Sequence, residues 1–355
     1  METATIFSTL ERRVRFDVNG PWGTIPGSLR LPFASGINPH VEDVRDQNVR
    51  WAIEIGLVDA DDHDMIDGIR RCRFEQLASL CHRDISREAL TLITNCHTAI
   101  FVFDDMLDDA RSEIGSQSAL AAHVTSYLSA AVADEPRPEL REDVPARERI
   151  IAVGNAYANV AQRLLRYTDR RGLRHYVDGM RNYFLGCVME STKRNQRMAH
   201  VADYSVVRLR CSAVYPTLDI GAIVEGIEVP DAVREEPAFE VMRQATNLCV
   251  SYVNDVFSYA KESSAGETSN LVIIYEQAGM DLRDSMQAAM VTSDRVVEEY
   301  FEAKAYLEAE LEDELDQATR DYIKVMQDWM RGNFDWYNDL RTDRYTDFLT
   351  TAVPA

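Results

Sequence analysis

The stretch that decides the fold is AFEVMRQATNLCVSYVNDVFSYAKESSA, residues 238–265. Neither glycine nor proline interrupts it, and its Leu, Ala, Met, Val, Glu and Arg residues lie at helical spacing. Residues 69–114 and 280–331 share both properties, and no alternating strand pattern bounded by turns stands out in the chain. The sequence therefore predicts an all-α fold in which each of these stretches forms one or two long helices.

Two segments rich in turn-forming residues interrupt this helical pattern. The first, NGPWGTIPGSLRLPFASGINPH at residues 19–40, predicts that residues 1–40 form an irregular N-terminal arm of the same domain. The second, ADEPRPELREDVPARE at residues 133–148, predicts a charged loop between two helices. No internal repeat or low-complexity tract is present, so residues 41–355 are expected to form a single helical domain.

The charge balance restricts the classes of partner. The chain has 355 residues, of which 46% are hydrophobic and 27% charged, as is typical of a globular protein with a substantial core. Its 59 Asp and Glu residues outnumber 38 Lys and Arg residues, and the formal net charge is −21. This excess disfavours nucleic acid and anionic membranes as partners, because both need a basic surface. An anionic small substrate then requires metal ions or a few focused cations to bind it.

The cysteines and the N-terminal residues predict the compartment. The six cysteines form no CxxC pair and no compact cluster with histidine, so buried free thiols in a reducing compartment are expected. The first residues, METATIFSTLERRVRF, lack the cationic start and long apolar stretch of a signal peptide. No window approaches about 18 consecutive apolar residues. We expect a cytoplasmic protein without stable membrane association.

A cluster of carboxylates, FVFDDMLDDA at residues 101–110, follows an apolar run. On a helix, Asp104 and Asp108 share one face, and Asp105 and Asp109 share the neighbouring face. Like charges four residues apart destabilise a helix by a few tenths of a kcal/mol (~0.3) per pair. Either a solvated helix end tolerates this repulsion, or a hard divalent cation such as Mg²⁺ binds the carboxylate oxygens.

A second polar set, in NDVFSYAKE at residues 254–262, favours the metal alternative. Asn254, Ser258 and Glu262 follow one helical ribbon at steps of four residues, and Lys261 falls close to the same line. An amide oxygen, a hydroxyl and a carboxylate are all ligands for Mg²⁺, and a lysine beside them can bind phosphate oxygens. The surrounding residues are too apolar for a solvated outer face.

Together these motifs resemble those of class I terpene synthases. DDMLD at residues 104–108 is similar to the family's DDxxD motif, and NDVFSYAKE is similar to its NSE motif, NDxxSxxKE. The family's C-terminal Arg-Tyr pair is matched by Arg344 and Tyr345 in RTDRYTDF, in the same order along the chain. The resemblance spans roughly residues 20–350 and implies an all-helical α-domain around an apolar active-site cavity, with the two metal motifs facing each other across its mouth.

The resemblance also implies an activity and its cofactors. Three Mg²⁺ ions, for which Mn²⁺ is a substitute, are expected to bind the diphosphate of a linear isoprenyl substrate. Farnesyl diphosphate is the first choice and geranylgeranyl diphosphate the second, and the product is a cyclic terpene. A homodimer is compatible with the family. The implied metal ligands are Asp104, with Asp105 and Asp108, for two ions and Asn254, Ser258 and Glu262 for the third.

Further side chains are expected to bind the diphosphate or the carbocation. Arg208, at the family's spacing for a diphosphate-sensing arginine, Lys261 and the pair Arg344 and Tyr345 would bind diphosphate oxygens, with Arg210 as the rival sensor. Phe101, one turn before the DDxxD motif, is the candidate for stabilising a carbocation. Phe74, Trp336 and Tyr337 are weaker candidates for which core packing is the alternative. The chain departs from the bacterial pattern at Cys211, where an aspartate is common, and in a longer Trp336-to-Arg344 spacing.

Two rival functions remain open from the sequence. A chain-elongating prenyltransferase shares the fold and metals, but it carries a second aspartate-rich motif where this chain has NDVFSYAKE. A non-catalytic helical binding protein of the same fold would lack Mg²⁺-dependent diphosphate binding. DADD, residues 59–62, matches the DxDD acid of class II cyclases, but that chemistry needs a second helical domain. Asp59 or Asp61 is expected to be a helix N-cap instead.

Overall fold

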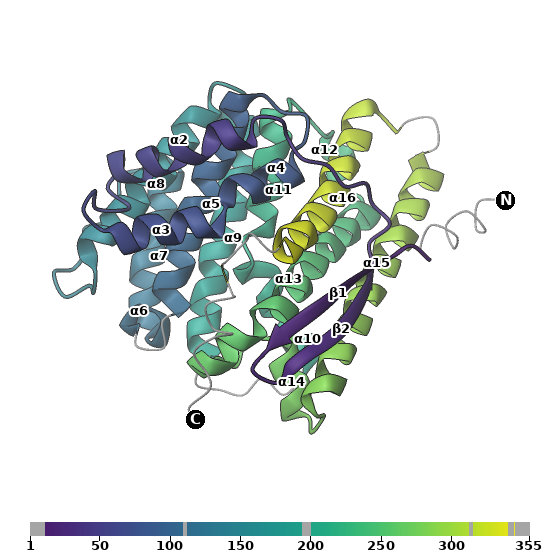
Figure 1. Ribbon diagram of the computed structural model, residues 1–355. Helices are drawn as coiled ribbons and strands as arrows, with labels where there is room; N and C mark the ends of the chain where they lie inside the picture. The colour runs from purple at the N-terminus through teal and green to yellow at the C-terminus, as the bar shows by residue number, and fades with distance from the viewer. Residues whose placement is uncertain (1–10, 109–111, 194–199, 312–314, 340–343, 345–355) are drawn as a thin grey trace. The chain divides into compact units, whose positions relative to one another are not determined.

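A computed structural model of the chain describes residues 11–108, 112–193, 200–311, 315–339 and 344, apart from the side chains of Asp108 and Lys193. Helices make up most of the described residues, and the strands form one antiparallel pair near the N-terminus (Figure 1). The predicted all-α fold class is therefore confirmed. The chain divides into two compact units, which are described in turn. The predicted division into an arm at residues 1–40 and a domain at residues 41–355 stays a prediction.

Unit 2 comprises Ile37–Arg197 and Val206–Gly226. Its helices are α2 (Val41–Glu54), α3 (His63–Cys72), α4 (Phe74–Cys81), α5 (Arg87–Asp108), α6 (Glu113–Ser116), α7 (Ser118–Val132), α8 (Arg147–Leu164), α9 (Arg170–Lys193) and α11 (Val214–Val224). The last residues of α10 (Val201–Cys211) also belong to it. Helix α5 is central, because it packs against α2, α4, α8 and α11 and buries one residue after another along its length. The end of this buried helix carries the DDxxD motif.

Unit 1 comprises Met1–Gly36, Met198–Ser205 and Ile227–Ala355. Its elements are β1 (Arg13–Gly20), β2 (Gly23–Arg30), α12 (Asp231–Arg234), α13 (Pro237–Ala265), α14 (Leu271–Gln277), α15 (Leu282–Leu311) and α16 (Gln317–Asn338). Helices α13 and α15 run side by side, and α14 and α16 pack against this pair (Figure 1). Helix α13 starts with Pro237 in its first turn and ends at Gly266, whose φ of 76° is a left-handed cap. The stretch that decides the fold therefore forms one long helix.

The N-terminal arm is not irregular throughout, which corrects the prediction. Residues Arg13–Gly20 and Gly23–Arg30 pair as an antiparallel hairpin with Gly20 opposite Gly23. The apolar residues of β1 alternate, but Pro26 and Gly27 inside β2 look like strand breakers in sequence. Both strands are edge strands, where a proline is tolerated. Gly20 has a specific role, because a Cβ there would lie 2.3 Å from the Trp22 ring.

Charged and aromatic contacts fasten the hairpin to the helices of unit 1. Asp294 of α15 accepts hydrogen bonds from the backbone N–H of Arg30, at 2.7 Å, and from the Arg13 guanidinium, at 2.7 Å. The Phe16 ring lies 5.3 Å, centroid to centroid, from both Phe257 of α13 and Phe334 of α16. The hairpin therefore supports the part of α13 that carries the NSE motif.

The glycine- and proline-free stretches predict helix positions better than helix numbers. Residues 280–331 hold α15 and most of α16, as expected, but residues 69–114 are divided among α3, α4, α5 and the start of α6. The break between α3 and α4 falls at Arg73, whose φ of 53° is left-handed. A non-glycine residue in this conformation has no signature in the sequence. The predicted loop at residues 133–148 lies between α7 and α8, although α8 already begins at Arg147.

Two features of the structure bear on the predictions about cysteines and membrane association. All six cysteines are free thiols, and five are buried, with Cys72 half-buried. Among the helices that the structure describes, none combines the length and the apolar character needed to span a bilayer.

Candidate functional site

The two neighbouring carboxylates Asp104 and Asp105, near the end of α5, face different surroundings in unit 2. Asp104 is half-buried and lies near Tyr183 and Cys187 of α9. Burial is the main cause that raises the pKa of both groups, and the Asp104 carboxylate contributes to each rise. Asp105 is exposed and lines a pocket of about 220 Å³ together with residues of α3, including Met65. Of these two carboxylates, it is thus Asp104 that approaches the buried polar groups of α9.

The helix face of α5 that precedes Asp104 carries uncharged side chains, among them His97 and Phe101. His97, two turns earlier, is buried, and burial lowers its pKa to about 3, so it is neutral at pH 7. Phe101 is half-buried, and its ring stacks on Phe74 with centroids 4.7 Å apart and an angle of 11°. Phe74 therefore covers one face of the Phe101 ring. Phe74, which is 2% exposed, is a core residue.

Arg208, near the end of α10, and Asp104 both lie near the Cys211 thiol inside unit 2. Burial raises the pKa of Cys211 well above its ordinary value, the charge of Glu190 raises it further, and Arg208 opposes the rise through its charge and a hydrogen bond. The Asp104 carboxylate acts on the same thiol. Arg210 instead donates from Nη1 to the carbonyl oxygen of Val206, one turn back on its own helix, at 3.1 Å. Arg208 therefore acts on a thiol that the Asp104 charge also affects, whereas Arg210 bonds back to its own helix, and the choice of Arg208 as the diphosphate sensor stays a prediction.

Gly186 of α9 lets α10 approach closely enough to hold Arg208 in this position. A Cβ at Gly186 would lie 2.4 Å from the backbone N of Cys211 and 2.5 Å from the backbone C of Arg210. We therefore expect Gly186→Ala to lower the free energy of unfolding by roughly 1–3 kcal/mol, because the helices must separate. Urea denaturation measures this change.

Gly68 of α3 provides the matched control for the Gly186 prediction. No heavy atom lies within 4 Å of the Cβ that alanine would add there. Gly68→Ala should raise the free energy of unfolding by about 0.5–1 kcal/mol, since alanine is the better helix former. Equal effects of the two substitutions would contradict the close packing of α9 on α10.

The polar set of α13 lies on a mostly buried part of unit 1. Ser258 is fully buried, whereas Asn254, Lys261 and Glu262 are half-buried. Upstream on α13, Asn247 is also fully buried. The prediction that this is not a solvated outer face is confirmed. The spacing of four residues puts Asn254, Ser258 and Glu262 on one ribbon of the helix.

The chemistry of these α13 side chains fits a hard divalent cation. The Oγ of Ser258 is buried and has no hydrogen-bond partner among the described residues. A buried polar atom of this kind is costly unless a water, an ion or a ligand satisfies it. The described part of the chain contains no cluster of three or more His, Cys, Asp or Glu residues suited to a metal. That observation is compatible with the motif, since two of its three α13 ligands are an amide and a hydroxyl.

Two hydrogen bonds that the sequence does not predict hold side chains of α13, and one of them involves Tyr337, which the sequence suggested only as a weaker carbocation candidate. Asn254 Nδ2 donates to Tyr337 Oη at 2.6 Å, so Tyr337 is a hydrogen-bond acceptor for a candidate ligand. The Tyr337 ring stacks on Phe257, with centroids 5.4 Å apart. Asp255, the second residue of the motif, is fully buried and accepts a hydrogen bond from the Tyr204 hydroxyl. Tyr337 and Tyr204 have no periodic relation to the motif in the sequence, because they lie on α16 and α10.

The structure describes only some of the remaining residues that the sequence predicts for the site. Arg344 is described and is 9% exposed, but Tyr345 and the side chain of Asp108 lie outside the described residues. Trp336 is fully buried beside Tyr337 and is a core residue.

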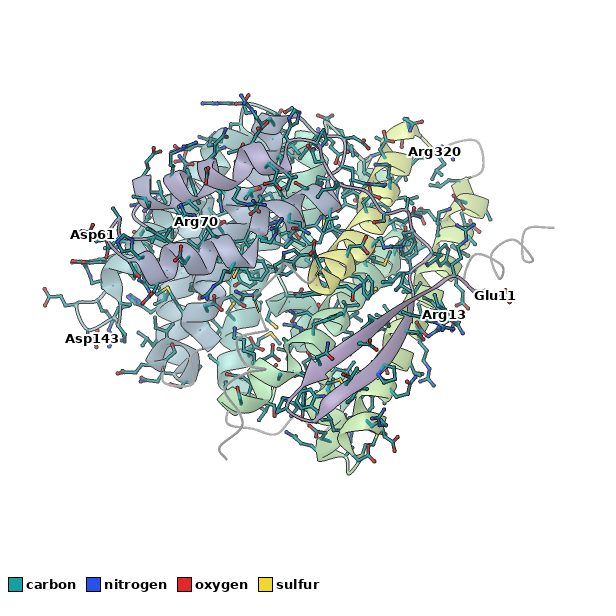
Figure 2. All side chains as sticks on the ribbon, in the orientation of Figure 1. Glu11, Arg13, Asp61, Arg70, Asp143 and Arg320 are labelled. Atoms are coloured by element: carbon teal, nitrogen blue, oxygen red, sulfur yellow. The ribbon has the colours of Figure 1, made fainter. Side chains whose placement is uncertain are left out.

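The DADD segment at residues 59–62 contains a helix cap, as expected, but at a different residue. The N-cap of α3 is Asp62, whose Oδ1 accepts a hydrogen bond from the backbone N–H of Met65 at 3.0 Å. The prediction of Asp59 or Asp61 as the cap is wrong, because α3 begins at His63 and its cap is the residue directly before it. Asp61 is exposed and projects from the loop before α3 (Figure 2).

Comparison with known proteins gives a consistent result. The family model "Terpene synthase family 2, C-terminal metal binding" matches residues 95–302, a range that contains both predicted motifs. A (+)-T-muurolol synthase of Roseiflexus castenholzii, described as cyclizing (2E,6E)-farnesyl diphosphate, is 27% identical over 323 residues, or 89% of this chain and 93% of that protein. Pristinol synthase of Streptomyces pristinaespiralis is 27% identical over 342 residues, or 92% and 86% of the two chains.

Solved structures support the fold. The crystal structure of germacradien-4-ol synthase from Streptomyces citricolor superposes with a TM-score of 0.72 at 23% identity, covering 88% of this chain and 98% of that one. The structure of a cucumene synthase variant gives a TM-score of 0.74 at 20% identity and covers 88% and 99% of the two chains.

Proposed function

Because the chain belongs to the class I terpene synthases, as a member of terpene synthase family 2, we propose that it cyclises a linear isoprenyl diphosphate. Farnesyl diphosphate is the proposed substrate, and geranylgeranyl diphosphate is the second choice. Relatives named as cyclizing (2E,6E)-farnesyl diphosphate, which align with about nine-tenths of this chain, support the shorter substrate. The products are a cyclic terpene and inorganic diphosphate, which makes the protein a carbon–oxygen lyase.

One observation carries the proposal: the match to the family's metal-binding model includes both the DDxxD and the NSE motif. The family description supports a divalent metal as cofactor. We propose three Mg²⁺ ions, with Mn²⁺ as a substitute. Asp104, Asp105 and Asp108 would hold two of them and Asn254, Ser258 and Glu262 the third. The unpartnered Ser258 hydroxyl supports the assignment on α13.

The reaction begins with heterolysis of the bond between C1 of the substrate and its diphosphate oxygen. The bonding electrons leave with the diphosphate, and an allylic carbocation remains. Bound divalent ions would supply neutralisation of the leaving group, so that this bond breaks without protonation. Arg208, Lys261, Arg344 and Tyr345 would donate hydrogen bonds to the diphosphate oxygens and keep the anion away from the cation.

The carbocation requires surroundings that are dry and weakly nucleophilic. Phe101 is the proposed aromatic partner, because an aromatic ring one turn before the DDxxD motif can stabilise a cation by about 0.5–2 kcal/mol. The neighbouring side chains on this side of α5 carry no charge either, because His97 is neutral and Phe74 stacks on the Phe101 ring. Cyclisation ends when the final cation loses a proton or adds water.

A product assay tests the proposed function. Purified protein is incubated with farnesyl or geranylgeranyl diphosphate, with Mg²⁺ or with a chelator, and the hexane extract is analysed by gas chromatography–mass spectrometry. We expect a cyclic hydrocarbon or alcohol from farnesyl diphosphate that depends on metal. A longer prenyl diphosphate formed when isopentenyl diphosphate is added would instead indicate a chain-elongating enzyme. No product from either substrate, with folding intact, would contradict the proposal.

A further inference from the structure

Asn270, directly before α14, uses all of its side-chain hydrogen-bonding groups inside unit 1. It is fully buried. Its Oδ1 accepts from the backbone N–H groups of Val272, at 2.8 Å, and Ile273, at 3.4 Å, which makes it the N-cap of α14. Its Nδ2 donates to the carbonyl oxygen of Asp255, at 2.8 Å, and to Oε2 of Glu262, at 2.8 Å. An amide offers two donors and one oxygen, so the orientation of this side chain is fixed.

The contacts of Asn270 reach both ends of the NSE motif. Asp255 follows the first proposed ligand, Asn254, and Glu262 is the last. The next residue, Leu271, donates its backbone N–H to Oδ2 of Asp255 at 3.0 Å. The segment at residues 270–271 therefore ties the motif stretch of α13 to the start of α14.

The hydrogen bond to Glu262 suits a metal ligand. Glu262 is half-buried, and a long side chain in this position has several rotamers to choose from. A neutral amide selects one of them without placing a positive charge beside the carboxylate. Lysine or arginine in the same place would compete with a cation for that charge. Ligating carboxylates in proteins are commonly oriented by such outer hydrogen bonds.

We propose that Asn270 is a positioning residue for the metal ligands of α13. By this inference it holds the Glu262 carboxylate in the orientation in which Glu262 binds a divalent cation together with Asn254 and Ser258. The inference rests on the proposed function, because it takes Glu262 to be a ligand. The competing role is that of a helix cap alone.

Asn270→Ser separates the two roles. Serine is as good an N-cap as asparagine, so α14 keeps its cap, but its short side chain cannot reach Glu262. Bound Mn²⁺ is measured by electron paramagnetic resonance in the presence of inorganic diphosphate, together with the thermal unfolding midpoint. We expect Asn270→Ser to weaken the binding of one Mn²⁺ ion by roughly 10- to 100-fold.

Asp316 provides the matched control for a lost cap. Asp316 is the N-cap of α16 and accepts from the backbone N–H of Thr319 at 2.8 Å, away from the motif. Asp316→Ala should lower the unfolding midpoint without changing Mn²⁺ binding. If Asn270→Ser does not fold, Asn270→Asp retains the cap acceptor and removes the donors. Wild-type Mn²⁺ binding by either folded Asn270 variant overturns the inference.

Glu262→Ala distinguishes failure of the inference from failure of the proposed site. If Glu262→Ala leaves Mn²⁺ binding unchanged, the metal assignment on α13 is wrong, and the inference is lost with it. If Glu262→Ala weakens Mn²⁺ binding and Asn270→Ser does not, only the role of Asn270 is wrong. Where Asn270 acts through Glu262, adding Asn270→Ser to Glu262→Ala should weaken binding no further.

Discussion

Asp104→Asn is expected to lower kcat/KM for farnesyl diphosphate by roughly 100- to 1,000-fold. The amide removes the negative charge with almost no change in volume, so a proposed metal ligand is lost while the packing of α5 persists. Asp104 is half-buried, and its charge acts on Tyr183 and Cys187 of α9. Steady-state kinetics with saturating Mg²⁺, and circular dichroism to verify helical content, measure the effect.

Asp105→Asn is the matched comparison, because Asp105 is a proposed ligand too but lies in different surroundings. The substitution is chemically the same and lies one residue away, but Asp105 is exposed and lines the pocket on the α3 side. Its effect on kcat/KM should be at least roughly tenfold smaller than that of Asp104→Asn, a difference of about 1.4 kcal/mol. Full activity of Asp104→Asn would remove that residue from the site. Equal losses in both variants would show that the two carboxylates share the role.

The parts of this molecule that sequence predicts are those set by local spacing. Pro237 and Gly266 delimit α13, and the steps of four residues place Asn254, Ser258 and Glu262 on one ribbon. These features depend on helix geometry, which repeats along the chain. The burial of this ribbon could also be inferred, since its neighbours in sequence are apolar.

The parts that sequence does not predict depend on contacts between distant segments. Asn270 before the apolar run LVIIY is recognisable as a helix cap, but its hydrogen bond to Glu262 is not. Tyr337 lies 83 residues from Asn254 and meets it only because α16 packs against α13. The left-handed Arg73 and the proline-containing strand β2 are likewise imposed by packing over local preference. A single sequence carries no signal for such pairings.

Arg208 and Arg210 give the second test with a large expected effect. Both lie in the last turn of α10. The charges of Arg208 and Asp104 both affect the pKa of the Cys211 thiol. Arg210 instead donates a hydrogen bond to the carbonyl oxygen of Val206 on its own helix. We expect Arg208→Ala to lower kcat by roughly 100-fold, because a donor to the departing diphosphate is lost. Arg210→Ala should change kcat by about twofold at most, because the Arg210 guanidinium bonds to a carbonyl oxygen of its own helix.

Arg208→Lys separates the charge of Arg208 from its geometry. Lysine keeps the positive charge but loses the planar fork that can bind two diphosphate oxygens at once, so partial recovery of kcat is expected. Inhibition by inorganic diphosphate should weaken in Arg208→Ala in parallel with kcat, since both depend on binding the same anion. Unchanged kinetics in Arg208→Ala together with a collapse in Arg210→Ala would transfer the sensing role to Arg210. A loss of helical content in Arg208→Ala would instead indicate that the contact between Arg208 and Cys211 stabilises α10. If Arg208→Lys keeps its helical content and still has a lowered kcat, the loss of activity is due to the missing guanidinium and not to unfolding.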